Sequence, residues 1–147
     1  MSGYRNILCA TDFSDCSKKA VEVAAEMAQR YGAQLTLLHV IDYFPEDRSN
    51  VQIAPEDVDP KHYHEDRART MLAEIGRQLG YDRLVQEVRF STHSARHEIV
   101  HFANEHNTDV IIVACHGHQG IISALGSTAY GVLHSASCDV LTVRLSA

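Results

Sequence analysis

The sequence has few cysteines, and none of its apolar runs is long. The four cysteines stand at positions 9, 16, 115 and 138, with no Cys-x-x-Cys pair and no spacing typical of a disulfide framework, so we expect free thiols. No segment approaches the roughly 20 apolar residues of a membrane helix. The first residues also lack the apolar segment of a signal peptide. These absences predict a cytoplasmic protein with no membrane partner.

Clusters of basic residues are also missing. The chain of 147 residues has 19 acidic and 13 basic side chains, a net charge of -6 and a pI near 5.9. An acidic chain of this kind is poorly suited to bind nucleic acid or an anionic membrane surface. The length is sufficient for a substantial apolar core, so we predict a single domain over residues 1–147.

Short apolar runs alternate with helical patterns along the chain. We predict strands at residues 6–11, 34–41, 84–90, 109–114 and 140–144, and helices from Ser14 to Gly32 and at residues 61–79, 93–106 and 127–135. The inward stripe of the second helix is predicted to comprise Ala68, Met71, Leu72, Ile75 and Leu79. Residues 42–60 contain all three prolines and are expected to form a surface loop. The alternation predicts an α/β fold, a doubly wound parallel sheet with helices on both faces.

Small and hydroxyl-bearing residues gather where two predicted strands end. Thr11 and Asp12 end the first strand, and the fourth strand runs into Ala114-Cys115-His116-Gly117. Eight residues later, Gly126-Ser127-Thr128 opens a helix. Ligands of doubly wound sheets bind at the carboxyl ends of strands. Glycine and hydroxyls between a strand and a helix N-terminus can cradle a phosphate. The sequence therefore predicts an anion-binding site at this edge.

Four segments together resemble the universal stress protein family. These are Ile7 to Ser14, Leu37 to Asp42, Glu98 to Val113 and Gly126 to Arg144, and they span nearly the whole chain in the order of the family. The resemblance implies a five-stranded sheet of order 3-2-1-4-5 and a role in stress tolerance. It also implies homodimers that pair through the last strand, here Val140, Leu141, Thr142 and Val143.

Some members of this family bind ATP through Gly, two residues, Gly, nine residues and then Gly-Ser or Gly-Thr. An Asp after the first strand and a Val in the second help to hold the ribose and adenine, and Asp12 and Val40 match these positions. In this chain Ala114 takes the first glycine position, Gly117 takes the second, and eight residues precede Gly126. A register that uses Gly117 and Gly120 leaves only five.

Two functions remain open from this pattern. One is a nucleotide-regulated module that binds ATP with Mg²⁺, and its binding residues would be Ala10, Thr11, Asp12, Val40, Ala114, His116, Gly117, Gly126, Ser127 and Thr128. The other is a nucleotide-free interaction protein, because branches of the family without the glycine pattern are not thought to bind ATP. No nucleophile–base pair is visible in the sequence, so neither reading is that of a dedicated enzyme. Slow, incidental ATP hydrolysis is a third and weaker alternative.

The ten histidines include one segment that formally matches a zinc motif. His97-Glu98-Ile99-Val100-His101 fits His-Glu-x-x-His, and His93 precedes it by one helical turn. Three imidazoles in a row on one helix face do not close a tetrahedral site, so we predict a solvated helix surface and no metal site. His39, within a strand, is expected to be partly buried and hydrogen-bonded.

Overall fold

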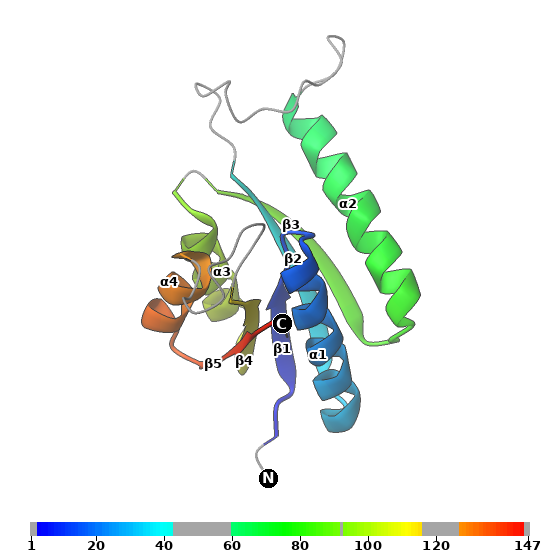
Figure 1. The fold of residues 1–147 in the computed structure, drawn as a ribbon, viewed down its shortest axis with the longest axis vertical. Coiled ribbons are helices and arrows are strands. Elements are labelled where there is room, and N and C mark those ends of the chain that lie inside the picture. Colours follow the sequence, from blue (N-terminus) through cyan, green and yellow to red (C-terminus); the bar gives the residue numbers. More distant parts are fainter. Residues whose placement is uncertain (1–2, 43–59, 92, 116–126, 146–147) are drawn as a thin grey trace.

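Five strands and four helices alternate along the chain in the computed structural model, which describes residues 3–42, 60–91, 93–115 and 127–145 (Figure 1). The strands are β1 (Asn6–Ala10), β2 (Gln34–Asp42), β3 (Leu84–Ser91), β4 (Val110–Ala114) and β5 (Asp139–Val143). The helices are α1 (Asp15–Tyr31), α2 (Pro60–Leu79), α3 (Ala95–Glu105) and α4 (Ser127–Ser135). Their order and type are those predicted from the sequence.

The five strands form one parallel sheet in the order β3-β2-β1-β4-β5. β1 lies in the centre, with Ile7 in register with Leu35 of β2 on one side and with Val110 of β4 on the other. β3 and β5 are the two edges of the sheet. The predicted α/β fold and the strand order implied by the family resemblance are both confirmed.

Each face of the sheet is covered by two helices (Figure 1). Successive side chains of β1 point to opposite faces, so Ile7 and Cys9 join a core under α1 and α2, whereas Leu8 joins a core under α3 and α4. All three side chains are fully buried. The strands read as continuous apolar runs because both of their faces are covered.

Helix α1 is delimited by the residues that the sequence predicted. The Ser14 side chain accepts a hydrogen bond from the Ser17 amide, and so caps the first turn. Gly32 takes a left-handed conformation with φ of 65° at the other end, and its amide donates to the Ala28 carbonyl. These caps fix where α1 starts, directly after the loop that follows β1.

Polar contacts between residues far apart in the sequence stabilise the amino end of the sheet, where the strands begin. The Tyr4 hydroxyl donates to Asp139 at 2.8 Å, 135 residues away. One carboxylate oxygen of Asp109 accepts from the amides of Arg5 and Asn6 at 2.8 and 2.9 Å. These contacts hold the amino end of the sheet together, and the predicted site lies at the opposite end.

Some details differ from the sequence-based prediction. Met71 does not belong to the inward stripe of α2, because its side chain is 39% exposed while its neighbour Leu72 is 1% exposed. α2 covers only β2 and β3, and a helix above a sheet edge buries a narrow stripe. Asp42 and Pro60 were predicted as loop, but Asp42 ends β2 and Pro60 begins α2. The residues between them lie outside the described ranges.

In the described ranges, no helix is long and apolar enough to cross a membrane.

Candidate functional site

A cavity of about 250 Å³ opens at the carboxyl ends of β1 and β4. It is lined by seven of the ten residues predicted to bind nucleotide, namely Ala10, Thr11, Asp12, Val40, Ala114, Ser127 and Thr128. The other three, His116, Gly117 and Gly126, lie outside the described residues. Residues far apart in the sequence thus lie together at the carboxyl ends of the strands, where the sequence predicted a site.

Seven further residues line this cavity and were not predicted. They are Ser17, Leu38, Ala95, Ile99, Val113, Cys115 and Ala129. Most are apolar, and in a sequence they look the same as residues of the core. Ser17 carried a detectable signal, since a second hydroxyl three residues after a helix cap lies on the same side of the first helical turn.

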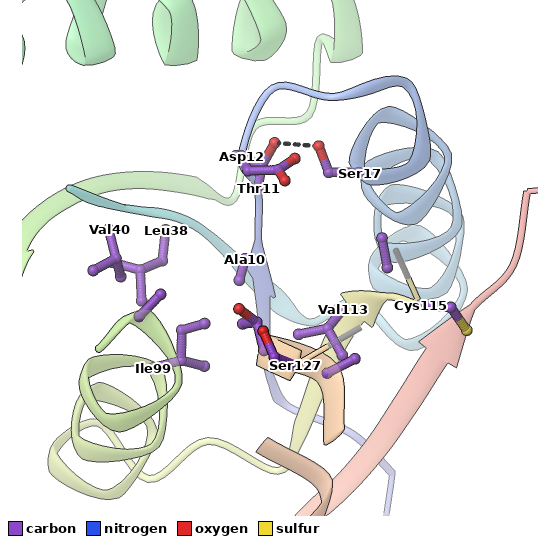
Figure 2. A pocket seen from close by; sticks show the side chains of 14 residues that line it. Ala10, Thr11, Asp12, Ser17, Leu38, Val40, Ile99, Val113, Cys115 and Ser127 are labelled. Carbon is purple, nitrogen blue, oxygen red and sulfur yellow. Dashed lines mark hydrogen bonds between the residues drawn. The ribbon is translucent and has the colours of Figure 1, made fainter. Parts of the chain in front are cut away.

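Polar and apolar lining are segregated within the cavity. Figure 2 shows Thr11, Asp12 and Ser17 together near the start of α1, and Leu38, Val40 and Ile99 grouped away from them. A ligand with one apolar flat part and one polar part would match this division.

Three buried hydroxyls hold the turn between β1 and α1. The Thr11 and Ser17 hydroxyls lie 3.0 Å apart, and the Ser14 hydroxyl donates to that of Ser17 at 3.3 Å. Ser17 also donates to the Ser14 carbonyl at 3.0 Å, and the Phe13 amide donates to the Thr11 hydroxyl at 3.1 Å. All three hydroxyl residues are at most 5% exposed. The network satisfies its own members, so its role is to fix the turn.

Asp12 is placed by that turn. One of its carboxylate oxygens accepts from the Ser14 amide at 3.0 Å, and the residue is exposed. Phe13 between them has a φ of 66°, a left-handed conformation that is uncommon for a residue other than glycine. The carboxylate is thereby held at the cavity.

His39 supports the same turn from β2. Its Nδ1 lies 2.7 Å from the Thr11 carbonyl, and its ring packs on Phe13 at 4.4 Å between centroids. A carbonyl only accepts, so Nδ1 carries the proton and donates. Burial lowers the pKa of His39, although this hydrogen bond and the carboxylates of Asp12 and Asp42 partly offset the effect. The predicted environment of His39, partly buried and hydrogen-bonded, is confirmed.

The first turns of three helices contribute to the cavity lining. Ser17 belongs to the start of α1, Ala95 begins α3, and Ser127 with Thr128 begins α4. The N-terminal ends of helices carry partial positive charge and attract anions. Asp12 is the one carboxylate among the described lining residues, and no imidazole is among them. The arrangement suits a ligand with anionic groups near the helix starts and hydroxyl donors near Asp12.

The histidines of α3 do not form a zinc site in the described part of the chain. The rings of His93 and His97 lie 5.1 Å apart, and His101 pairs with Glu105 at 3.2 Å on the exposed surface. No three His, Cys, Asp or Glu side chains are grouped to hold a metal within the described ranges. Ile99, inside the formal motif, is 2% exposed and faces the core.

A parallel sheet in this order, with a cavity at the carboxyl ends of its central strands, defines the class of doubly wound α/β domains. The model of the universal stress protein family matches residues 3–144, and the chain belongs to this family. Universal stress protein A homolog 1 of Coxiella burnetii is 35% identical over 142 residues, which cover 95% of this chain and 96% of the relative.

Solved structures show the same fold. The universal stress protein UspA from Lactobacillus plantarum has a TM-score of 0.79 at 25% identity, covering 98% of this chain and 100% of its own. A universal stress protein in complex with cAMP has a TM-score of 0.71 at 23% identity, over 99% of this chain and 100% of that one. The protein from Archaeoglobus fulgidus in complex with dAMP has a TM-score of 0.70 at 20% identity, over 96% and 98%.

Proposed function

We propose that this chain is a nucleotide-regulated stress-response module that binds an adenine nucleotide in the cavity between β1 and β4. The observation that carries the proposal is the convergence of Asp12, Val40, Ser127 and Thr128 on one cavity. Two family members of the same fold were solved with adenine nucleotides, cAMP and dAMP, which supports this ligand class.

Each part of a nucleotide has a counterpart in the cavity. The apolar side chains of Leu38, Val40 and Ile99 suit the adenine ring, and the Asp12 carboxylate suits a ribose hydroxyl. The start of α4, with the Ser127 and Thr128 hydroxyls, suits the first phosphate. The cavity has a volume of about 250 Å³, so the further phosphates of ATP, with Mg²⁺, would extend beyond the described lining.

Binding without turnover is the proposed activity. The described lining offers a single carboxylate and no imidazole, and that carboxylate is engaged by the Ser14 amide. Neither a nucleophile activated by a base nor a general acid is provided by these residues. We propose that nucleotide binding changes the surface through which one copy of the chain contacts a second copy.

The proposal includes a homodimer formed through β5 and a cytoplasmic location. β5 is an edge of the sheet, and its central residues Val140, Leu141 and Thr142 are uncharged and only partly buried. An uncharged edge strand invites pairing with a second strand. We also propose that residues 1–147 act as one domain of this kind.

A nucleotide-free interaction protein is the second candidate. It is favoured by Ala114, which takes the position of the first family glycine and lines the cavity with a methyl group. A β-carbon there limits how closely the backbone and a phosphate can approach. In that case the surface of the dimer would carry the function.

Calorimetric titration with ATP, AMP and cAMP tests the proposal. Asp12→Asn keeps an oxygen that can accept from the Ser14 amide but removes the charge, so the turn should survive. We expect this variant to bind about fivefold more weakly, because a charged acceptor is worth about 1 kcal/mol more than a neutral one. Asp12→Ala, which also frees the Ser14 amide, should lose more.

Asp15→Asn is the matched control. Asp15 is an exposed carboxylate in the first turn of α1, 3.8 Å from Lys18 and outside the cavity lining. It carries the same charge change and should leave nucleotide affinity unaltered. An absence of heat with all three ligands up to millimolar concentration would reject nucleotide binding and favour the nucleotide-free candidate.

A further inference from the structure

A second groove lies between α3 and α4, on the outer surface of that helical layer. It has a volume of about 770 Å³, and it is lined by His93, Ser94, Arg96, His97, Val100, Tyr130, Gly131, His134 and Ser135. None of these residues lines the nucleotide cavity. The groove is therefore a separate place on the molecule, and nothing in the proposed nucleotide site explains its composition.

The lining differs in charge from the rest of the chain. The whole sequence carries a net charge of -6, yet the groove lining includes one guanidinium, three imidazoles and no carboxylate. Most surface arginines of the described helices face an acid of their own helix, for example Arg30 with Glu26 at 2.9 Å. Arg96 forms no ion pair within the described ranges. Its charge is available to a ligand.

Gly131 shapes the position of Arg96. A β-carbon on Gly131 would lie 2.2 Å from Cδ of Arg96 and 3.1 Å from its Cγ, whereas no other side chain is among its nearest neighbours. The aliphatic part of Arg96 therefore lies directly against the backbone of α4. Arg96 extends from α3 over α4 and lines the groove. This packing is possible because the buried residue beneath it, Gly131, has no side chain.

Hydrogen-bonding groups on both sides of the groove line it together with that guanidinium. On α4, Nε2 of His134 lies 2.9 Å from the Tyr130 hydroxyl. On the other side, the rings of His93 and His97 lie 5.1 Å apart, one turn from each other. Imidazoles, hydroxyls and a guanidinium can all donate to an anion, and a guanidinium presents two parallel N–H groups to a phosphate.

We propose that the groove between α3 and α4 is a second binding site, for the phosphate group of a small phosphorylated molecule. Arg96 would hold the phosphate oxygens, with His97 and His134 donating from the two sides. Val100 and the Tyr130 ring would form the wall for the organic part of the ligand, since a groove of about 770 Å³ is larger than a phosphate needs.

The test is a titration followed by amide NMR shifts, with inorganic phosphate and glycerol 3-phosphate as probes. We expect saturable shifts at His97, Gly131 and His134, separate from any shifts at Thr11 and Ser127 in the nucleotide cavity. Tighter binding of the ester would identify a phosphorylated metabolite as the ligand class, and equal binding would identify the free phosphate ion.

Two variants distinguish the groove from a general charge effect. Arg96→Gln should weaken phosphate binding about tenfold, as expected for loss of a charged hydrogen bond. Gly131→Ala keeps every charge but displaces the Arg96 side chain, and it should weaken binding in the same direction. Arg30→Gln, with an equal change in net charge far from the groove, should have less than about a twofold effect at physiological salt.

The proposal is overturned if phosphate at about 20 mM, a concentration that nearly saturates a site with a Kd near 1 mM, causes no shifts in the groove. It is also overturned if Arg96→Gln and Arg30→Gln weaken binding equally. Loss of nucleotide binding in Asp12→Asn leaves the groove shifts intact, so the two proposals fail independently.

Discussion

His39 links the central sheet to the turn that carries Asp12. Its Nδ1–H donates to the Thr11 carbonyl at 2.7 Å, and its ring lies on Phe13, whose φ of 66° shapes the turn. A left-handed conformation at a residue with a β-carbon costs about 1–2 kcal/mol. Contacts from His39 therefore help to keep the Asp12 carboxylate at the cavity.

The lowered pKa of His39 predicts a pH dependence of stability. Its usual value is 6.5, and burial lowers the value in the folded protein. Between the folded pKa and about 6.5 the unfolded chain binds the extra proton, so the free energy of unfolding falls as the pH is lowered through this window. We expect His39→Asn, which keeps a donor for the Thr11 carbonyl, to show a shallower loss. Urea unfolding at pH 7.5 and pH 5.5, values chosen to be roughly one unit on either side of this usual pKa, measures it.

His97→Asn serves as the control for that measurement. His97 is exposed on α3 and takes no part in the contacts of His39, so its replacement removes an imidazole without touching the turn that carries Asp12. If His39→Asn and the unaltered protein lose stability in parallel between the two pH values, the assigned role of His39 in this window is wrong.

Among the helices, α1 shows how much of an element can be predicted from the sequence. Ser14 and Gly32 marked its ends correctly, because caps are local and depend on one residue each. Met71 in α2 was assigned wrongly, because helical spacing alone does not reveal how much of a helix the sheet edge covers. Each predicted strand differs from the observed one by a single residue at one or both ends.

The candidate site was predictable only in part for a related reason. Asp12 and Ser127 carry polar groups at strand and helix ends, where a sequence reveals them. Ile99 and Ala95 enter the lining only because α3 packs across β2, a tertiary fact that no local pattern encodes. The groove beside Arg96 depends on the approach of α3 to Gly131 of α4, so it was invisible in the sequence.

Gly32 supplies a prediction for helix α1. Its φ of 65° needs a residue that tolerates the left-handed region, and a β-carbon there would meet no atom within 4 Å. Gly32→Ala should lower the free energy of unfolding by about 1–2 kcal/mol from backbone strain alone. Gly32→Asn should lose less, because asparagine tolerates this conformation better. Chemical denaturation of the two variants measures the difference, and equal losses would refute the explanation by backbone conformation.

The edge strand β5 is uncharged after Asp139, its first residue. The Val143 carbonyl accepts from the Cys115 amide at 2.9 Å, so the backbone groups of Val143 face β4. Successive residues of a strand direct these groups to opposite sides, and those of Thr142 therefore face the open edge. A second copy that pairs through β5 would bind to the backbone of Thr142 and Val140.

Thr142→Pro is the substitution that separates dimerisation from folding. Proline removes an amide on the open side only, and edge strands tolerate it there. We expect a folded monomer, while Thr142→Ala stays dimeric and Leu141→Pro, which breaks the ladder to β4, loses stability. Sedimentation velocity together with thermal unfolding measures both properties. A Thr142→Pro protein that remains a dimer would place the interface elsewhere.

The central position of β1 determines when its strand pairs can form during synthesis of the chain. β1 is synthesised before the other four strands, and one of its two neighbours, β4, follows about a hundred residues later. The contact between Tyr4 and Asp139 closes only with the final strand, 135 residues on. Parallel pairings over such distances close slowly, because a long loop must be ordered first. A nascent chain that stops before β4 therefore carries an apolar strand with an unpaired side, and its survival depends on how quickly translation is completed.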